Sequence, residues 1–415
     1  MNLLKEHFHI ALRLLLPCAI LVISIFFESR ALVLGSFTAI MIVFLAYRNI
    51  SPSKSQIIWI ITGMLTILLV LVMIIKSDSS QGRLLIYKIT IHIYRDHWLW
   101  GIGYGNFQRT YMHYQGAYFL KGDYSIKELM LADNTYFAFN DYFQYVVETG
   151  LGGLILLLTI IIGFILLIKK ALENSSDVLL YYALSLLVII CIAANFTYIF
   201  NNTSFQIVAI ISSSIILFYG TLHLRQRNIR ISITVAISLS LILMLPHYIL
   251  QAVEYNEIKK LKQAKLLERA GYKKEALDII KNLKMSLSEN TEYLEFESYN
   301  LLNTLQLSRA KTITEKLIRI KPSNELYSRL GSIAVLQKDF SEAEKAYLYA
   351  INMVPNRLTP RYKLYQCYKS SGEEIKARTC GRAILTLPIK VPSSFATQIK
   401  LTVAEDFNKL NYKTL

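Results

Sequence analysis

Long apolar segments alternate with short polar ones over the first 250 residues. A helix needs roughly 20 residues to cross the ~30 Å hydrocarbon core of a bilayer, and most of these segments are that long. Because a backbone inside hydrocarbon must satisfy its own hydrogen bonds, we expect each segment to be a membrane-spanning helix. The second is short for a span. The pattern predicts seven spans, at residues 10–27, 31–47, 56–75, 146–168, 178–199, 204–222 and 231–250.

The first apolar segment admits two interpretations, a cleaved signal peptide or a retained span. It is longer than a typical signal-peptide core and lacks a convincing small-residue cleavage site. The sequence therefore favours a retained span.

Basic residues near the spans predict the orientation. If the spans alternate in direction, the short basic clusters all fall on one side, which the positive-inside rule identifies as the cytoplasm. The polar loop 77–141 and everything after Leu250 then lie outside, in a periplasm or its equivalent. The clusters contain Lys5, Arg13, Arg48, Lys54, Lys169, Lys170, Arg225, Arg227 and Arg230.

The loop 77–141 is unusually long for a polar segment between two spans, and such loops commonly carry function. It contains a Trp- and Gly-rich turn, Trp98 to Gly105. Residues 84–94 have the pattern of an amphipathic helix that lies on the outer leaflet. We therefore expect this loop to work at the membrane surface.

After Leu250 the apolar period changes to that of amphipathic helices and the sequence repeats. Pro322, Pro355 and Pro388 are each 33 residues apart. The unit Asn324–Pro355 resembles a tetratricopeptide repeat, and Thr359–Pro388 resembles a later unit with Gly381 where an aromatic residue is expected. Small residues recur in the same register, at Ala276, Ala310, Ala343 and Ala377.

The sequence thus divides into a membrane domain, 1–250, and an α-solenoid of repeats, 251–415. Arrays of this kind bind peptides or proteins on a concave face, so a protein partner is one expectation and a spacer role is the other. The segment 251–415 has 28 Lys and Arg against 18 Asp and Glu, which places most of the net charge of +16 there. A basic surface beside a membrane can bind anionic lipid or glycan, or can simply be a solvated face. Nucleic acid is not expected as a partner outside the cell.

Two arginines lie where a plain membrane anchor would not need them. Arg30 follows the first span, where a charge next to hydrocarbon is costly and hence a functional candidate. Arg83 begins the amphipathic segment of the loop. The guanidinium group binds phosphate with two hydrogen bonds and stays charged. The alternatives are an interfacial side chain that reaches toward the headgroups and a solvated helix end.

The end of the loop carries a second group of candidates. A carboxylate at the membrane boundary, at Asp141 or Glu148, can orient an arginine or act as an acid or base. The alternative is a helix-start carboxylate that the helix dipole favours. The glycines after Glu148 permit close helix contact. This group contains Asn134, Asn140, Asp141, Tyr142, Glu148, Gly150, Gly152 and Gly153.

Metal and dinucleotide sites are not expected. His92, His97 and His113 do not have the spacing of a zinc site. Gly101, Gly103 and Gly105 alternate without the strand and helix that a dinucleotide fingerprint requires. No cofactor is predicted.

Taken together, residues 24–168 resemble the O-antigen ligase and O-antigen polymerase superfamily of bacterial glycan-assembly enzymes. The order and spacing of several short elements relative to the spans carry the resemblance. These elements are Ser29–Arg30, Gly82–Arg83, the turn Gly101–Gly103, the segment Phe139–Asn140–Asp141–Tyr142, and Glu148 with Gly150.

The resemblance implies an all-α, GT-C-like membrane helix bundle in the bacterial inner membrane, with a periplasmic repeat domain. It also implies metal-independent glycosyl transfer from an undecaprenyl-pyrophosphate-linked donor. Arg30 and Arg83 would bind the pyrophosphate, and Asp141 and Glu148 would complete the catalytic group. The acceptor hydroxyl could belong to lipid A core, another glycan or a protein. The alternative is a non-catalytic, membrane-anchored scaffold that recruits proteins to an envelope complex.

Two features depart from the family pattern. Phe139 stands where many ligases have histidine, so His113, Asp141 and Glu148 become the candidates to replace it. The seven predicted spans are fewer than the family usually has, as though the chain lacked the first several.

Overall fold

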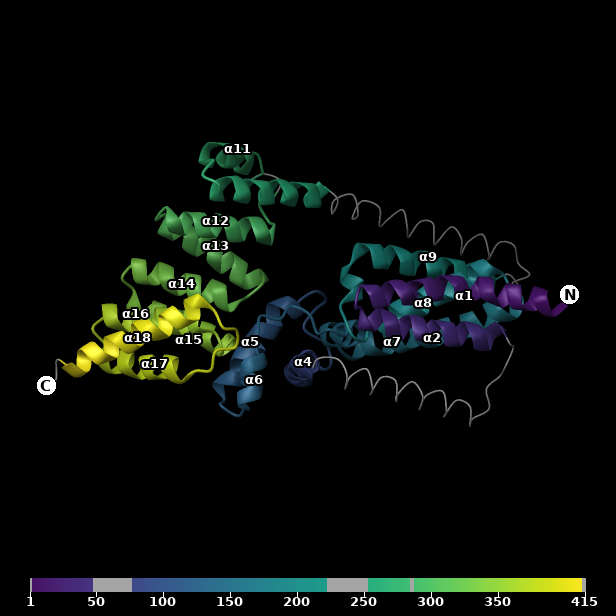
Figure 1. Ribbon diagram of the computed structural model, residues 1–415, viewed down its shortest axis with the longest axis horizontal. Coiled ribbons are helices and arrows are strands. Elements are labelled where there is room, and N and C mark those ends of the chain that lie inside the picture. The colour runs from purple at the N-terminus through teal and green to yellow at the C-terminus, as the bar shows by residue number, and fades with distance from the viewer. Residues whose placement is uncertain (1, 48–76, 222–252, 284–286, 413–415) are drawn as a thin grey trace. The chain divides into compact units, whose positions relative to one another are not determined.

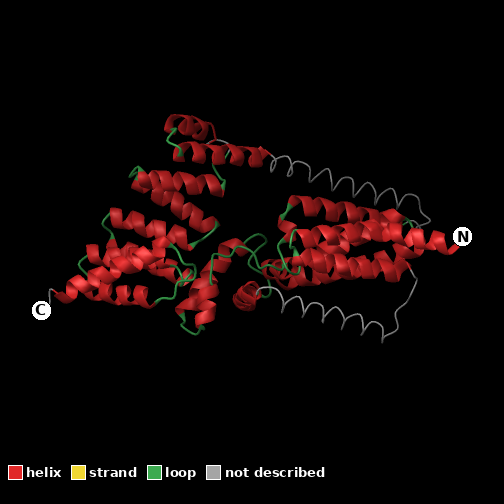
Figure 2. Cartoon of the chain, viewed as in Figure 1, coloured by secondary structure: helices red, strands yellow, loops and turns green. Residues whose placement is uncertain are grey.

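A computed structural model describes residues 2–47, 77–221, 253–283 and 287–412, and all regular elements within these ranges are helices (Figure 2). The all-α prediction is confirmed for this part of the chain. The expected spans at 56–75 and 231–250 lie outside the described residues.

The chain forms two compact units. The first contains Met1–Ser80, His97–Tyr104 and Phe137–Gln251, and the second contains Gln81–Asp96, Gly105–Tyr136 and Ala252–Leu415. Most of the long loop therefore folds with the C-terminal part of the chain, whereas the Trp- and Gly-rich turn and the end of the loop fold with the membrane helices.

Among the described residues of the first unit, five apolar helices lie side by side (Figure 1). Four of them are long and apolar enough to cross a membrane, and α8 is a shorter apolar helix. Much of the apolar surface of α7 faces outward, as contact with lipid requires. The helices are α1 (Asn2–Phe26), α2 (Arg30–Tyr47), α7 (Asp141–Asn174), α8 (Val178–Ala193) and α9 (Thr203–Gly220).

The expected span 178–199 is helical only to Ala193. There the side chain of Asn195 donates to the Cys191 carbonyl oxygen at 3.0 Å and takes up an acceptor that the end of the helix leaves open. A short 3₁₀ helix, η1 (Ile199–Asn201), then leads into α9.

Small residues allow α2 and α8 to pack closely. A Cβ on Gly35 would lie 2.8 Å from the Ile189 carbonyl oxygen, so only glycine fits there. Ser36 and Ala39, on the same helix, are fully buried. Small side chains of this kind commonly mediate helix association in membranes.

The loop forms three helices, α4 (Ser77–His97), α5 (Phe107–Leu120) and α6 (Ile126–Leu131). The predicted amphipathic helix 84–94 falls inside α4. Lys88 Nζ of α4 contacts Glu128 Oε1 of α6 at 2.8 Å, and the Tyr118 hydroxyl of α5 donates to the same carboxylate at 3.0 Å. These contacts connect all three helices.

The C-terminal helices pack in successive pairs, α12 on α13, α14 on α15 and α16 on α17. Within each pair the turn uses a residue in the left-handed region, and these residues recur 33 or 34 positions apart: Gly271, Leu305, Lys338 and Gly372. The predicted recurring alanines are all buried. The helices are residues 253–269, α11 (Lys273–Leu283), α12 (Thr291–Asn303), α13 (Leu307–Ile320), α14 (Asn324–Leu336), α15 (Phe340–Met353), α16 (Leu358–Ser370), α17 (Glu374–Thr386) and α18 (Ser394–Tyr412).

Gly381, where the repeat pattern expects an aromatic residue, has aromatic rings against it. A Cβ there would lie 2.4 Å from the ring of Phe407, which comes from α18, and 3.3 Å from that of Tyr365. The missing aromatic group is thus supplied from a later helix. Cys367 and Cys380 remain free thiols.

Candidate functional site

Two of the motifs, about 45 residues apart in sequence, meet in the first unit through their backbones. The Ile102 N–H donates to the Val147 carbonyl oxygen at 3.2 Å, and the Gly103 N–H donates to that of Glu148 at 2.9 Å. In the other direction, the Leu151 N–H donates to the Trp98 carbonyl oxygen at 2.9 Å. We call this contact between residues 98–103 and 147–151 the backbone junction.

Glycine is required on both sides of the backbone junction. Gly101 has a φ of 69°, and a Cβ there would lie 2.3 Å from the Glu148 carbonyl oxygen. Gly150 has a φ of 67°, and its Cβ would lie 2.4 Å from the Leu99 carbonyl oxygen. Both positions combine a left-handed backbone with close approach of a second chain segment, which only glycine tolerates. Gly150 also places a kink inside α7.

The expected contact of the glycines after Glu148 with another helix is not found among the described residues. Gly150 contacts the turn at Leu99–Gly101 rather than another helix. No described atom lies within 4 Å of a Cβ built on Gly152, and the space beside Gly153 is filled by Thr149 of the same helix. The kink at Gly150 explains the difference, because it turns this side of α7 toward the loop.

Glu148 is buried at the backbone junction, with 3% of its surface exposed. The Gln144 side chain donates from Nε2 to Glu148 Oε1 at 3.2 Å, and its Oε1 accepts from the Ala138 N–H at 3.0 Å. Gln144 thus joins the carboxylate to the segment that precedes α7. The Glu148 carboxylate is therefore held in one orientation beside the backbone junction.

Asn140, Asp141 and Tyr142 begin α7 and anchor it. Asn140 is the N-cap, and its side chain accepts from the Phe143 N–H at 2.9 Å. Asp141 Oδ2 accepts from the Phe200 N–H at 3.0 Å, and the Tyr142 hydroxyl donates to the Cys191 carbonyl oxygen at 3.0 Å. Asp141 thus attaches the start of α7 to the segment between α8 and α9, and Tyr142 attaches it to the last turn of α8.

Phe139 has a left-handed backbone, with a φ of 54°. This conformation costs roughly 1–3 kcal/mol for a non-glycine residue and persists only where the surroundings enforce it. Its ring packs edge-on against Tyr198, which also stacks on Phe137 at 4.4 Å. The position at which the family often has histidine is therefore strained and lined by aromatic rings.

Arg30 is the first residue of α2 and is partly buried. A cation at a helix N-terminus opposes the helix dipole, so helix stability does not explain its position. Ala31 and Leu32, the next two residues, pack with Tyr142 against the core around Ile190. Arg30 therefore begins its helix at the end of the bundle where α7 also begins.

Gly82, Arg83 and His113 belong to the second unit. A Cβ on Gly82 would have no described atom within 4 Å. His113 Nδ1 lies 2.7 Å from the Tyr349 hydroxyl of α15, and burial lowers the pKa of His113. The imidazole considered as a replacement base is thus neutral and bound to a C-terminal helix.

Of the predicted site residues, the first unit contains Arg30, the turn Gly101–Gly103, Asn140–Tyr142, and Glu148 with Gly150, and it brings the turn against Glu148 and Gly150. Sequence reasoning missed the contact between the turn and Glu148–Gly150. Alternating glycines in a loop were the available signal, since they permit close backbone approach. Within the described ranges, no three His, Cys, Asp or Glu side chains gather as a metal site requires.

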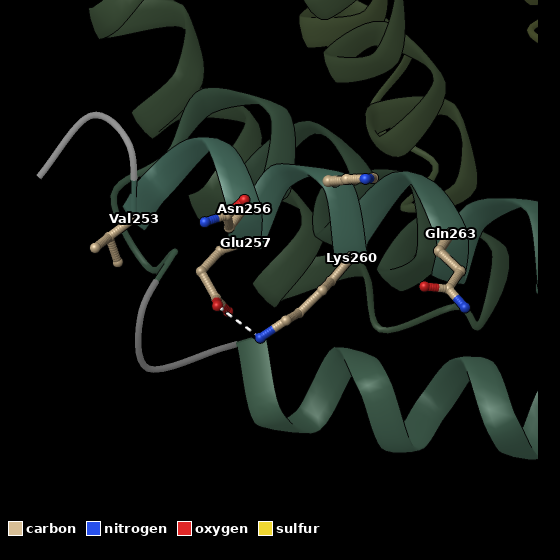
Figure 3. A pocket seen from close by; sticks show the side chains of 6 residues that line it. Val253, Asn256, Glu257, Lys260 and Gln263 are labelled. Carbon is tan, nitrogen blue, oxygen red and sulfur yellow. Dashed lines mark hydrogen bonds and ion pairs between the residues drawn. The ribbon is translucent and has the colours of Figure 1, made fainter. Parts of the chain in front are cut away.

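A surface hollow of 420 Å³ elsewhere contains none of the predicted site residues (Figure 3). Its lining comes from the helix at 253–269, where Glu257 and Lys260 form an ion pair at 2.8 Å. A single helix face with a paired charge offers no converging groups for chemistry.

Comparison with known protein families points in the same direction as this geometry. Residues 14–158 match the model of a family described as O-antigen ligase. The matched range includes both arginines and the backbone junction. The match supports the O-antigen ligase superfamily, and with the apolar helices it indicates a multi-pass membrane protein. No curated protein matches the chain.

Proposed function

We propose that this protein transfers a glycan from an undecaprenyl-pyrophosphate carrier to an acceptor hydroxyl, as an O-antigen ligase or polymerase does. One observation carries the proposal. Within the range that matches the ligase family, the buried Glu148 lies at the backbone junction between the loop turn and α7. A scaffold would not need a buried carboxylate at that place.

In the proposed reaction the acceptor oxygen attacks the anomeric carbon, with inversion of configuration. The bond between this carbon and the pyrophosphate oxygen breaks, and the electron pair leaves with the carrier. Arg30 and Arg83 bind the pyrophosphate and stabilise the charge that develops on it, an effect that is often the largest contribution to catalysis. The acceptor proton passes to a carboxylate.

Glu148 is a better candidate for this base than Asp141. The Asp141 carboxylate accepts a hydrogen bond from the Phe200 N–H, and this bond to the backbone fixes the start of α7. Glu148 is more deeply buried and is oriented by the side chain of Gln144, beside the turn of the backbone junction. We therefore propose Glu148 as the base and Asp141, with Asn140 and Tyr142, as positioning residues.

We further propose that residues 77–141 and the C-terminal helices lie in the periplasm, with the spans in the inner membrane. The C-terminal pairs would then be tetratricopeptide-like repeats. The recurring buried alanines and left-handed turns support this assignment. The acceptor would be a glycan, lipid A core or a protein.

The test replaces Arg83 by Ala and by Lys in the native host and compares lipopolysaccharide and glycoprotein profiles. Arg83→Ala is expected to lower transfer by at least ~100-fold, since charge stabilisation of this kind is a large part of catalysis. Arg83→Lys should recover only part of it, because lysine does not bind phosphate through two parallel hydrogen bonds. Arg95→Ala, on the exposed surface of the same helix, is the control. Unchanged profiles for Arg83→Ala would support the scaffold instead.

A further inference from the structure

Three C-terminal residues at equivalent positions of the sequence repeat contact the same two loop residues. Asn324, Arg357 and Lys390 each follow one of the 33-residue-spaced prolines by two residues. Arg357 NH2 lies 2.8 Å from Asp133 Oδ1, and Lys390 Nζ lies 3.6 Å from Asp133 Oδ2. Asn324 Oδ1 accepts from Asn134 Nδ2 at 2.9 Å. One acidic–amide pair in the loop thus contacts three successive repeats.

Buried amide groups reinforce this contact. Asn356, which is 5% exposed, directs Nδ2 at the carbonyl oxygens of Leu129 and Ala132, at 2.8 and 2.7 Å. Gln115 of α5, which is 1% exposed, donates to the carbonyl oxygens of Asp133 at 3.0 Å and Met353 at 2.6 Å. Buried hydrogen bonds of this kind are costly to break, because the loss leaves polar groups without partners.

Charge also favours the docked loop. Although partial burial favours the neutral acid, the hydrogen bond and the charge of Arg357 lower the pKa of Asp133, so its carboxylate stays ionised. The ammonium group of Lys321 lies 4.2 Å from the centre of the Tyr136 ring. Basic residues of the C-terminal part thus bind the chain's own loop at this edge.

We propose that this edge of the C-terminal helices, formed by Asn324, Asn356, Arg357 and Lys390, is a clamp whose ligand is the chain's own segment Leu129–Tyr136. The clamp holds the loop in its working conformation. Only Phe137, Ala138 and Phe139 separate the clamped segment from Asn140, the cap of α7, so the clamp restrains the chain just before that helix. This role in transfer rests on the proposed function, but the docking itself does not.

Disulfide trapping tests the docking without any activity assay. A Cβ on Gly116 of α5 would lie 3.9 Å from the Met353 Cα and 3.6 Å from its Cγ, which suits a disulfide. In a chain whose native cysteines are replaced by serine, Gly116→Cys with Met353→Cys should form a disulfide in membranes under mild oxidant. Gly116→Cys with Ile375→Cys, an exposed residue of α17, should not.

A transfer assay tests whether the clamp holds the loop in its working conformation. Asn356→Asp keeps the shape of the side chain but sets a carboxylate against carbonyl oxygens, so it should open the clamp and lower transfer at least ~10-fold. Asn303→Asp, the same change at an exposed site, should have no effect. The disulfide-locked Gly116→Cys with Met353→Cys chain should keep its transfer activity.

Two results would overturn the clamp. One is the absence of a disulfide between the two cysteines introduced at Gly116 and Met353 although both thiols react with maleimide, since the loop would then not dock. The other is a disulfide between these two cysteines that abolishes transfer until the disulfide is reduced, since the docked loop would then be a resting state. If the disulfide forms and the unmodified chain shows no transfer at all, the proposed function fails and the docking stands.

Discussion

The backbone junction of the first unit and the clamp of the second unit both immobilise the long loop, but by different means. The junction uses main-chain hydrogen bonds and two glycines with left-handed backbones. The clamp uses side-chain amides and ion pairs from positions that recur with the repeat. A backbone contact tolerates almost no substitution at its glycines, whereas a side-chain contact can be weakened in steps.

This difference bears on how motif residues are interpreted. Gly101 and Gly150 look like parts of a catalytic motif, yet their geometry gives them an architectural role that would exist without any substrate. Loss of activity in a glycine variant therefore says little about chemistry. Arg30, Arg83 and Glu148 are better probes of chemistry, because their side chains can be changed while the backbone junction is kept.

The largest effect is expected from Gly150→Ala. The added Cβ meets the Leu99 carbonyl oxygen at 2.4 Å on a backbone with a φ of 67°. Overpacking and the left-handed conformation together should cost roughly 3 kcal/mol or more. Thermal unfolding of the purified protein and its amount in the membrane measure this cost.

Gly152→Ala is the matched control, two residues away on the same helix. A Cβ there meets no described atom within 4 Å, and alanine is the better helix former by roughly 1 kcal/mol. Its melting temperature should equal or exceed that of the unmodified chain. Equal destabilisation by Gly150→Ala and Gly152→Ala would refute the backbone junction.

The next effect contrasts a buried contact of the clamp with an exposed one. Asn356→Ala removes the buried donor shared by the carbonyl groups of Leu129 and Ala132 and should cost about 2 kcal/mol. Arg357→Ala removes an ion pair whose partners are both nearly half exposed, so it should cost less than about 1 kcal/mol. Hydrogen exchange of segment 129–136 in the full chain reports both values, and the reverse order would contradict this account.

Phe139→His probes the short stretch of sequence between the clamped segment 129–136 and α7. Histidine is enriched several-fold at positive φ among non-glycine residues, so stability should change by no more than about 1 kcal/mol. If the imidazole serves as a base, transfer should rise as the pH passes through about 6.5 and the ring becomes neutral. Phe139→Leu is the control, and identical pH profiles for the two variants would exclude such a role.

The smallest effect concerns the ion pair that connects α4 and α6. Although burial opposes ionisation, hydrogen bonds from Lys88, Ser125 and Tyr118 lower the pKa of Glu128 to about 2. A lowered folded-state pKa adds stability that is complete above the ordinary value of 4.5 and is lost as pH falls toward 2. Glu128→Gln should therefore reduce the pH dependence of unfolding between these values, and should cost no more than about 1 kcal/mol at neutral pH. If Glu128→Gln left the pH dependence of unfolding unchanged between pH 2 and 4.5, this account of the ion pair would be contradicted.

Much of the helical architecture could be predicted from the sequence. Apolar length predicted spans at 10–27, 31–47, 146–168 and 204–222, and the structure has helices over most of these residues that are long and apolar enough to cross a membrane. The pattern is visible in the sequence because hydrocarbon imposes the same requirement on every residue of a span. The recurring alanines marked buried positions, since a repeat places equivalent residues in equivalent surroundings. The early end of α8 was missed because the expected span continued to residue 199, and hydropathy does not show where the backbone leaves the helix.

The candidate site was predicted in its parts and not in its contacts. Short motifs marked Gly101, Glu148 and Gly150, but nothing local shows that two segments so far apart share hydrogen bonds. Likewise Asp133 gave no signal in the loop, because its partners Arg357 and Lys390 lie 224 or more residues further along the chain. Long-range pairing of this kind depends on the folded chain rather than on any window of sequence.

Asn324, Arg357 and Lys390 occupy equivalent positions of the sequence repeat, so their contacts with the loop depend on the length of each repeated unit. In a simple stack of repeated helix pairs each pair contacts only its neighbours, so one whole unit can be gained or lost without disturbing distant parts. Here a gained or lost unit would also change which residue faces Asp133 and Asn134. The number of C-terminal helix pairs is therefore constrained, because Asp133 and Asn134 of the loop need a partner at each of these positions.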